Sequence, residues 1–212
     1  SASACFLQIF LLYSYGNIEL CNLAVMSYDR YLAICYPLQY NTRMTLKKFA
    51  VLIAVVWLFP VSKVASMICQ TAMLQVCVNI IPKVYCDNYS IVKQACSDTT
   101  VDNISGIIYT SHSTVGVICY TYVKILKVCF SGCKQTRQKA LSTCTPHLAS
   151  LLNFSFGCFF EIMQGRFNMR SVPNIVRIFL CLYFLTSQPL FNPVIYGLKL
   201  SKVYTLCKHL VL

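Results

Sequence analysis

Charged residues are scarce in this 212-residue chain, and acidic residues are the scarcest of them. Asp, Glu, Lys and Arg together make up 11% of the residues, and only six are acidic, whereas an ordinary soluble domain is about 25% charged. Hydrophobic residues make up 57%, and the mean hydropathy is +0.62. This composition excludes intrinsic disorder, which requires low hydrophobicity, and it favours a protein that lies in a bilayer.

Motifs for catalysis, metal binding and nucleic-acid binding are also missing. The net charge of +12 comes from Lys and Arg that lie between long apolar runs, a pattern typical of membrane flanks rather than of a nucleic-acid-binding patch. The three His residues fall in no Ser, Asp or Cys arrangement that indicates a triad. No phosphate loop and no zinc-type Cys spacing occurs. We therefore expect no enzyme, no cofactor, no metal and no nucleic-acid partner.

Long uncharged runs dominate what is present. Six stretches contain no Asp, Glu, Lys or Arg, namely 1–18, 49–62, 64–82, 103–123, 140–160 and 178–198. A helix needs roughly 20 mostly apolar residues to cross a bilayer, and the apolar runs do not alternate as the strands of a membrane barrel would. We predict an all-α, polytopic transmembrane helix bundle in a single domain over residues 1–212. Its spans are at about 6–30, 48–69, 102–126, 140–163 and 174–198, with an outer loop at 70–101 and a cytoplasmic tail at 199–212.

The basic residues predict the orientation of this bundle. Twelve of the 18 Lys and Arg residues fall on one set of alternate connections, five fall on the other set, and Lys63 lies within a span. The side with twelve is cytoplasmic by the positive-inside rule. Four cysteines then lie on the outer side, where disulfides persist, namely Cys5, Cys77, Cys86 and Cys96. Four cysteines allow three pairings, and their spacing does not choose between them.

Four strings of residues, in order along the chain, resemble vertebrate olfactory receptors. Met26–Cys35 with the following YPLQY resembles the end of the third helix of these receptors. Ala95–Thr99 resembles their long second outer loop, Lys139–Leu148 the start of their sixth helix, and Pro189–Tyr196 their seventh helix. The stretch Asn153–Ser155 is more similar to fish members. The resemblance covers the whole chain and implies that it holds five of the seven helices of a rhodopsin-like receptor, from the third helix to the C-terminal tail. We therefore expect a fragment.

The resemblance implies a function and a location. The receptor would bind a small-molecule odorant in the outer half of the bundle and activate a stimulatory heterotrimeric G protein of the olfactory type. It would lie among membrane lipids as a multi-pass protein of the plasma membrane, in the cilia of olfactory sensory neurons. Two alternatives stay open. One is the non-functional product of a truncated gene, and the other is a transporter subunit, for which Glu19 and Lys63 would be the only intramembrane charges.

The resemblance also assigns roles to residues. It implies the disulfides Cys5–Cys86 and Cys77–Cys96. Cys5 and Arg30 are 25 residues apart, about 37 Å of helix, so they lie at opposite membrane faces. The residues implied for G-protein coupling and for the activation switch are Asp29, Arg30, Tyr31, Tyr122, Asn192, Pro193 and Tyr196. Pro193 removes a backbone donor from its helix, and Asn192 can bond the freed backbone.

The expected odorant pocket draws on four helices. Residues that share a face by helical spacing are taken as its lining, although interhelical packing explains any one of them about as well. They are Leu12, Tyr13, Gly16, Asn17, Gly106, Ile107, Thr110, Ser155, Phe159, Ile162, Ile178, Leu182 and Leu185.

Two further residues carry open alternatives. Glu19 lies inside a span and either belongs to a buried polar or ion site or is simply tolerated as a protonated acid. Asn88, in the sequon Asn88-Tyr-Ser90, is a candidate for glycosylation, but it neighbours a cysteine that the resemblance places in a disulfide.

Overall fold

Helices make up nearly all of the chain that the structure, a computed structural model, describes. It describes residues 2–75, 77, 85–96, 100–131, 134–166 and 172–197. Within these helices, the side chains at 100–114, 136, 139, 162–166, 174, 181 and 195–197 lie outside the description. The chain divides into two units, Ser1–Arg137 and Gln138–Leu212, and each is described by itself.

The described residues contain helices and no β-strand, so the all-α prediction is confirmed. The elements are α1 (Ala2–Cys35), η1 (Pro37–Gln39), α2 (Tyr40–Arg43), α3 (Leu46–Ala72), α4 (Asn88–Lys93), α5 (Thr100–Ser131), α6 (Lys134–Arg166) and α7 (Asn174–Gly197). The five long helices contain most or all of the five predicted spans. Most of them extend further, because a hydropathy run marks the membrane-crossing part of a helix and not its ends. The predicted outer loop at 70–101 contains the short helix α4.

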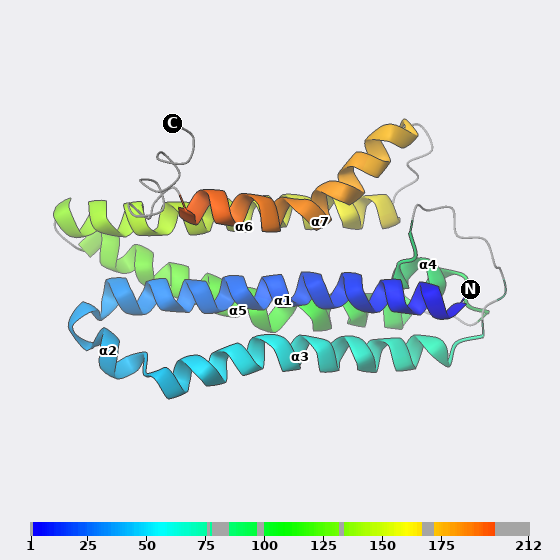
Figure 1. Cartoon of the computed structure of the whole chain (residues 1–212), viewed down its shortest axis with the longest axis horizontal. Coiled ribbons are helices and arrows are strands. Elements are labelled where there is room, and N and C mark those ends of the chain that lie inside the picture. The colour runs from blue at the N-terminus through cyan, green and yellow to red at the C-terminus, as the bar shows by residue number, and fades with distance from the viewer. Residues whose placement is uncertain are drawn as a thin grey trace, which may run out of the picture. The chain divides into compact units, whose positions relative to one another are not determined.

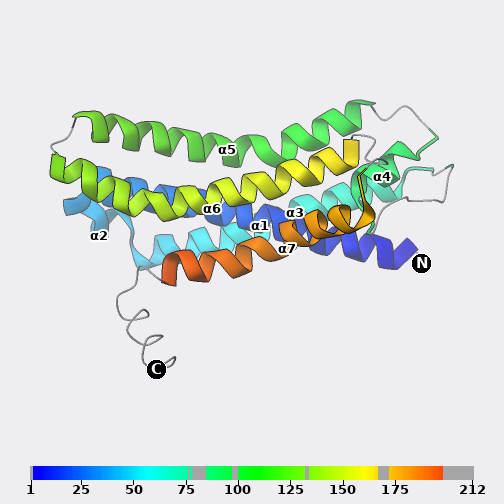
Figure 2. The same ribbon diagram turned by 90° about the horizontal axis from the view of Figure 1, so that it is seen from above.

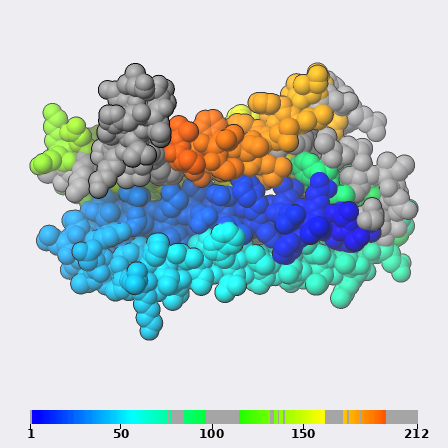
Figure 3. Space-filling model, in the orientation of Figure 1, coloured from blue at the N-terminus to red at the C-terminus, as the bar shows by residue number. Residues whose placement is uncertain are grey.

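In the first unit, α1 packs against both α3 and α5. Figures 1 and 2 show the three helices running side by side, with α3 antiparallel to the other two. Figure 3 shows the side chains of α1 and α3 meeting along both helices. Leu23 and Leu32 of α1, Val56 and Val64 of α3 and Ile125 of α5 are all buried. This apolar packing holds α1 against α3 and α5.

Local sequence explains where these helices begin and end. α1 ends at Cys35 because Tyr36 precedes Pro37, and a residue before proline avoids the helical region. α3 begins after Thr45, whose hydroxyl accepts a hydrogen bond of 3.3 Å from the Lys48 N–H. This is the N-cap arrangement that Thr commonly makes. The connection between α1 and α3 is therefore short, and it places α2 next to the end of α1.

Three helices in the described part of the chain are long and apolar enough to cross a membrane: α1, α3 and residues Ile175–Val194 of α7. Much of the apolar surface of α3 is exposed, including Trp57 and Leu58, as expected of a helix that faces lipid. The predicted span at 140–163 is not among these three, because α6 contains polar residues such as His147 and Asn153. The predicted span at 102–126 lies partly outside the described side chains.

In the second unit, α6 and α7 lie close together. A Cβ atom added at Gly157 of α6 would lie 3.2 Å from the ring of Phe184 and 3.4 Å from its Cα, so glycine permits this approach. The rings of Phe154 and Phe184 are 6.1 Å apart between centroids. α7 contains Pro189 and Pro193, and Figure 1 shows that it changes direction along its length.

Candidate functional site

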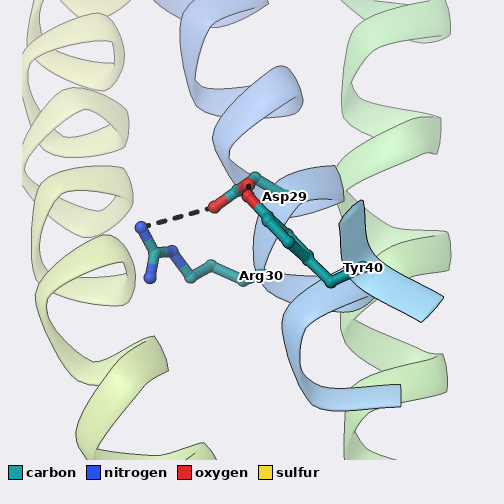
Figure 4. A network of polar contacts seen from close by, with 3 residues as sticks. All are labelled: Asp29, Arg30 and Tyr40. Carbon is teal, nitrogen blue, oxygen red and sulfur yellow. Dashed lines mark hydrogen bonds and ion pairs between the residues drawn. The ribbon is translucent and has the colours of Figure 1, made fainter. Parts of the chain in front are cut away.

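The C-terminal end of α1 carries a polar network that includes the Asp29-Arg30-Tyr31 motif. Asp29 is bonded through both carboxylate oxygens, one to Tyr40 Oη at 2.6 Å and the other to Arg30 Nη2 at 3.4 Å. Figure 4 shows Tyr40 reaching the Asp29 carboxylate from α2. Arg30 approaches it from α1, the helix that also carries Asp29. The side chains of Arg30 and Asp29 are 34% and 26% exposed. The ion pair is therefore partly open to solvent, where a change of partner costs little.

Tyr40 lies in α2, in the connection between two predicted spans, and its phenol bonds to Asp29. Its hydrogen bond to the Asp29 carboxylate, together with burial and the negative charge of Asp29, raises the pKa of Tyr40, and the charge of Arg30 partly offsets this. Since the ordinary value is already about 10, the phenol stays protonated at neutral pH and keeps donating to Asp29. The sequence did not single out Tyr40, because its contact with Asp29 spans eleven residues and a turn.

Further aromatic and basic residues surround this end of α1. Tyr31 Oη donates to Tyr36 Oη at 3.4 Å, and the Arg43 guanidinium lies 3.9 Å from the centroid of the Tyr36 ring. Lys48 Nζ donates to Tyr28 Oη at 2.6 Å. These contacts join α1 to η1, α2 and the start of α3.

The remaining residues expected for the activation switch lie on α5 and α7. Tyr122 of α5 is half-buried, and the neighbouring Thr121 donates a hydrogen bond of 3.1 Å to Ser27, which lies two residues before Asp29. α5 therefore passes close to the motif at the end of α1. Asn192 and Pro193 lie in the second unit, and the side chain of Tyr196 lies outside the description.

At the N-terminal end of α1, two disulfides join the loop segments around α4. The structure bonds Cys5 to Cys86 and Cys77 to Cys96, with Cα atoms 5.4 and 5.3 Å apart. These are the two pairs that the resemblance implied. The Cys86 N–H also donates to Gln8 Oε1 of α1 at 3.1 Å. Together these contacts anchor the loop to the start of α1.

The sequon at Asn88 lies inside this loop structure. Asn88 Oδ1 accepts a hydrogen bond of 2.7 Å from Thr71 of α3. Ser90 is buried and donates to the carboxylate of Asp87, which is also buried. An oligosaccharide transferase needs an exposed Asn and an accessible hydroxyl two residues later, and the folded loop occupies both groups.

The expected pocket residues differ in their surroundings. Leu12, Tyr13, Gly16 and Asn17 of α1 are all half-buried, and the Asn17 amide donates to the Tyr13 carbonyl at 2.8 Å within its own helix. In the second unit Leu185 is half-buried. The exposed members there are Ser155, Phe159, Ile178 and Leu182. The side chains of Gly106, Ile107, Thr110 and Ile162 lie outside the description, and Glu19 is half-buried on α1.

A buried polar cluster joins α6 to α7. Ser150 Oγ lies 2.6 Å from Asn192 Oδ1 and 3.1 Å from Gln188 Oε1, and Gln188 Nε2 donates to the Ser150 carbonyl at 3.2 Å. The sequence suggests that Asn192 can bond the backbone freed by Pro193. The hydrogen bond that the structure gives it crosses to α6 instead, and Gln188 and Ser150 were not singled out from the sequence.

Comparisons with known proteins show which family the chain belongs to. The family model described as olfactory receptor matches residues 1–212. The chain belongs to the olfactory receptor family. It is 32% identical to olfactory receptor 52N5 of Homo sapiens over 215 residues, which cover 95% of the chain and 64% of that protein. It is 34% identical to olfactory receptor 4E2 of Mus musculus over 216 residues, which cover 97% of the chain and 67% of that protein.

This olfactory receptor chain thus spans about two thirds of the length of the relatives that it matches. The relatives are named as receptors and not as enzymes, in agreement with the prediction that the chain is no enzyme. Family membership and the long apolar helices together make the chain a multi-pass membrane protein.

Proposed function

We propose that the chain is the odorant-sensing and G-protein-coupling part of an olfactory receptor of the plasma membrane. The family match over residues 1–212 and the apolar surfaces of α1, α3 and α7 support this proposal. In olfactory sensory neurons the receptor would lie in the lipid of the cilia. It would bind a small-molecule odorant and act on a stimulatory heterotrimeric G protein.

The proposed mechanism is a shift between two arrangements of the helices. An odorant in the outer half of the bundle binds the active arrangement more tightly than the resting one, and it shifts the equilibrium only by that difference. The sixth helix, α6, then moves outward at its cytoplasmic end. Arg30, Tyr122 and the basic connection between α5 and α6 meet the α subunit of the G protein there.

The arrangement of Asp29 is the observation that carries this proposal. Because Tyr40 and Arg30 use different oxygens of its carboxylate, Arg30 can leave Asp29 while the carboxylate keeps the hydrogen bond from Tyr40. The free-energy penalty is larger for a carboxylate that loses all of its hydrogen-bond partners than for one that keeps a partner. Asp29 therefore suits an arginine that must change partners, and an arginine that served only as a membrane anchor would not need Tyr40.

The test uses a chimeric receptor in which the chain is joined to the first two helices of mouse olfactory receptor 4E2. Odorant-evoked cyclic AMP is measured for the parental chimera, for Arg30→Ala and for Arg43→Ala at equal surface expression. Arg43 is the matched control, because it is an exposed arginine of α2 that lies on the Tyr36 ring. We expect Arg30→Ala to lower the response at least about tenfold, as loss of one charge-assisted contact does, and Arg43→Ala to leave it near the parental value. A response that survives Arg30→Ala would contradict the coupling role.

A further inference from the structure

A buried polar cluster lies between α6 and α7 in the second unit. Ser150 and Gln188 are both 0% exposed. Three contacts of 2.6 to 3.2 Å link Ser150 to Gln188 and Asn192. Polar groups inside a membrane protein have no water to replace a lost partner, so these contacts resist separation of the two helices.

The two partners of Ser150 occupy special positions in α7. Gln188 and Asn192 are four residues apart, so they lie on one face of the helix. Each directly precedes a proline, Pro189 and Pro193. Each proline removes a backbone hydrogen bond and makes the helix easier to bend. Ser150 is thus bonded to the two residues of α7 that directly precede its prolines.

The polar cluster depends on the hydroxyl of Ser150. Gln188 Nε2 donates to the Ser150 carbonyl, and Gln188 Oε1 therefore faces the Ser150 hydroxyl and accepts from it. Asn192 Oδ1 faces the same hydroxyl. A hydroxyl has one proton to donate, so the buried Gln188 oxygen and the half-buried Asn192 oxygen share a single donor. Removal of that hydroxyl leaves both acceptors without their donor, whereas loss of an exposed hydroxyl elsewhere on α6 does not.

We propose that Ser150, Gln188 and Asn192 form a clamp that holds α6 against the proline breaks of α7 in the resting receptor and so sets the level of signalling without ligand. The proposal rests on the proposed function, in which α6 moves away when the receptor is activated. Ser150 and Gln188 act here as positioning residues, because they touch neither odorant nor G protein. An average hydrogen bond between membrane helices shifts an equilibrium by about threefold. Loss of the two Ser150 hydroxyl contacts should therefore shift the resting equilibrium about three- to tenfold.

The test compares Ser150→Ala and Gln188→Ala with two matched controls in the same chimeric receptor. Thr145 of α6 and Thr186 of α7 are exposed, and each hydroxyl donates to a carbonyl of its own helix, that of Leu141 or Leu182. Thr145→Ala and Thr186→Ala therefore remove a hydroxyl without touching the clamp. Ser150→Thr keeps the hydroxyl and should restore parental behaviour. Two quantities are measured for each variant: ligand-independent cyclic AMP per receptor at the surface, and the unfolding temperature of the purified receptor.

We expect Ser150→Ala to raise ligand-independent cyclic AMP about three- to tenfold and to lower the unfolding temperature by about 2–4 °C, with both controls near parental values. If the parental receptor responds to odorant, a lowered unfolding temperature of Ser150→Ala with unchanged basal signalling would overturn the clamp as a regulator. An equal rise in Thr145→Ala would overturn it as well. If Ser150→Ala fails to reach the surface, the comparison of Gln188→Ala with Thr186→Ala decides in the same way.

Failure of the proposed function would look different. In that case no variant, including the parental receptor, would respond to any odorant. The clamp would then be judged by unfolding alone, and equal unfolding temperatures for Ser150→Ala and Thr145→Ala would overturn it.

Discussion

Tyr40 of α2 donates a hydrogen bond of 2.6 Å to the same carboxylate, Asp29, that pairs with Arg30 at 3.4 Å. The two contacts join the short helix after α1 to the charged motif at its end. A movement of α2 would therefore alter the hydrogen bonding of the Asp29 carboxylate, which also pairs with Arg30. This relationship links the connection between α1 and α3 to the proposed coupling residue.

Tyr40→Phe tests that link through stability. Removing one hydrogen bond to a charged group at a half-exposed site should lower the free energy of unfolding by about 1 kcal/mol at neutral pH. Asp29 raises the pKa of Tyr40, so folding favours the protonated phenol. Its contribution is complete below the ordinary value of about 10 and is lost as the pH rises through the raised folded value.

Unfolding of the purified receptor, measured from about pH 6 to pH 11, should show this dependence. The gap between parental and Tyr40→Phe receptors should stay constant up to about pH 9 and then narrow. Tyr120→Phe, which changes an exposed tyrosine of α5, should show no gap. A gap that widens at alkaline pH would contradict the assignment.

The two disulfides should contribute unequally to stability. Cys5–Cys86 closes 81 residues and Cys77–Cys96 closes 19. By chain entropy, Cys5→Ser should lower the free energy of unfolding by about 4–5 kcal/mol and Cys77→Ser by about 3 kcal/mol. Cys69→Ser, at an exposed thiol of α3 without a disulfide, is the control. Peptide mapping without reductant should recover both pairs, and a Cys77–Cys86 peptide would refute them.

Two glycines should respond oppositely to a side chain. A Cβ atom at Gly116 of α5 meets nothing within 4 Å, so Gly116→Ala should stabilise the chain by up to about 1 kcal/mol through helix propensity. A Cβ atom at Gly157 of α6 would lie 3.2 Å from the Phe184 ring, so Gly157→Val should destabilise the chain by about 1–3 kcal/mol through overpacking. The free energy of unfolding of both variants tests these expectations. A stabilising Gly157→Val would show that α6 and α7 are not in close contact at this position.

Asn88 should carry no glycan. Its side chain is bonded to Thr71, and Ser90 is buried against Asp87. We therefore expect Asn88→Gln to leave the electrophoretic mobility of the receptor from mammalian cells unchanged. A faster band for this variant, matched by glycosidase treatment of the parental receptor, would show that the loop is modified before it folds.

Hydropathy and family strings predicted much of this architecture, for reasons that the structure makes clear. Long uncharged runs predict helices because a bilayer leaves helices as the simplest way to satisfy the backbone. α4 was missed, since six residues carry too little periodicity to stand out from a loop. Its buried Ile91 and Val92 are recognised only in the folded unit.

Contacts between elements were harder to predict than the elements themselves. Tyr40 reaches Asp29 only because η1 turns the chain back toward α1. The spacing of Gln188 and Asn192 is visible in the sequence, but their common partner Ser150 is 38 and 42 residues away. Helical spacing likewise gave pocket candidates without showing which face is covered, and Phe159 and Leu182 are more than half exposed.

The central claim is that the long helices cross the membrane with their basic connections inside the cell. A protease site inserted at 132–133, between α5 and α6, tests it in intact cells that express the chimeric receptor. A second site at 79–82, between α3 and α4, serves as the opposite marker. The account predicts that added protease cuts the second site in intact cells and cuts the first only after the cells are permeabilised. Cleavage of the first site in intact cells would contradict the orientation on which the coupling role of Arg30 depends.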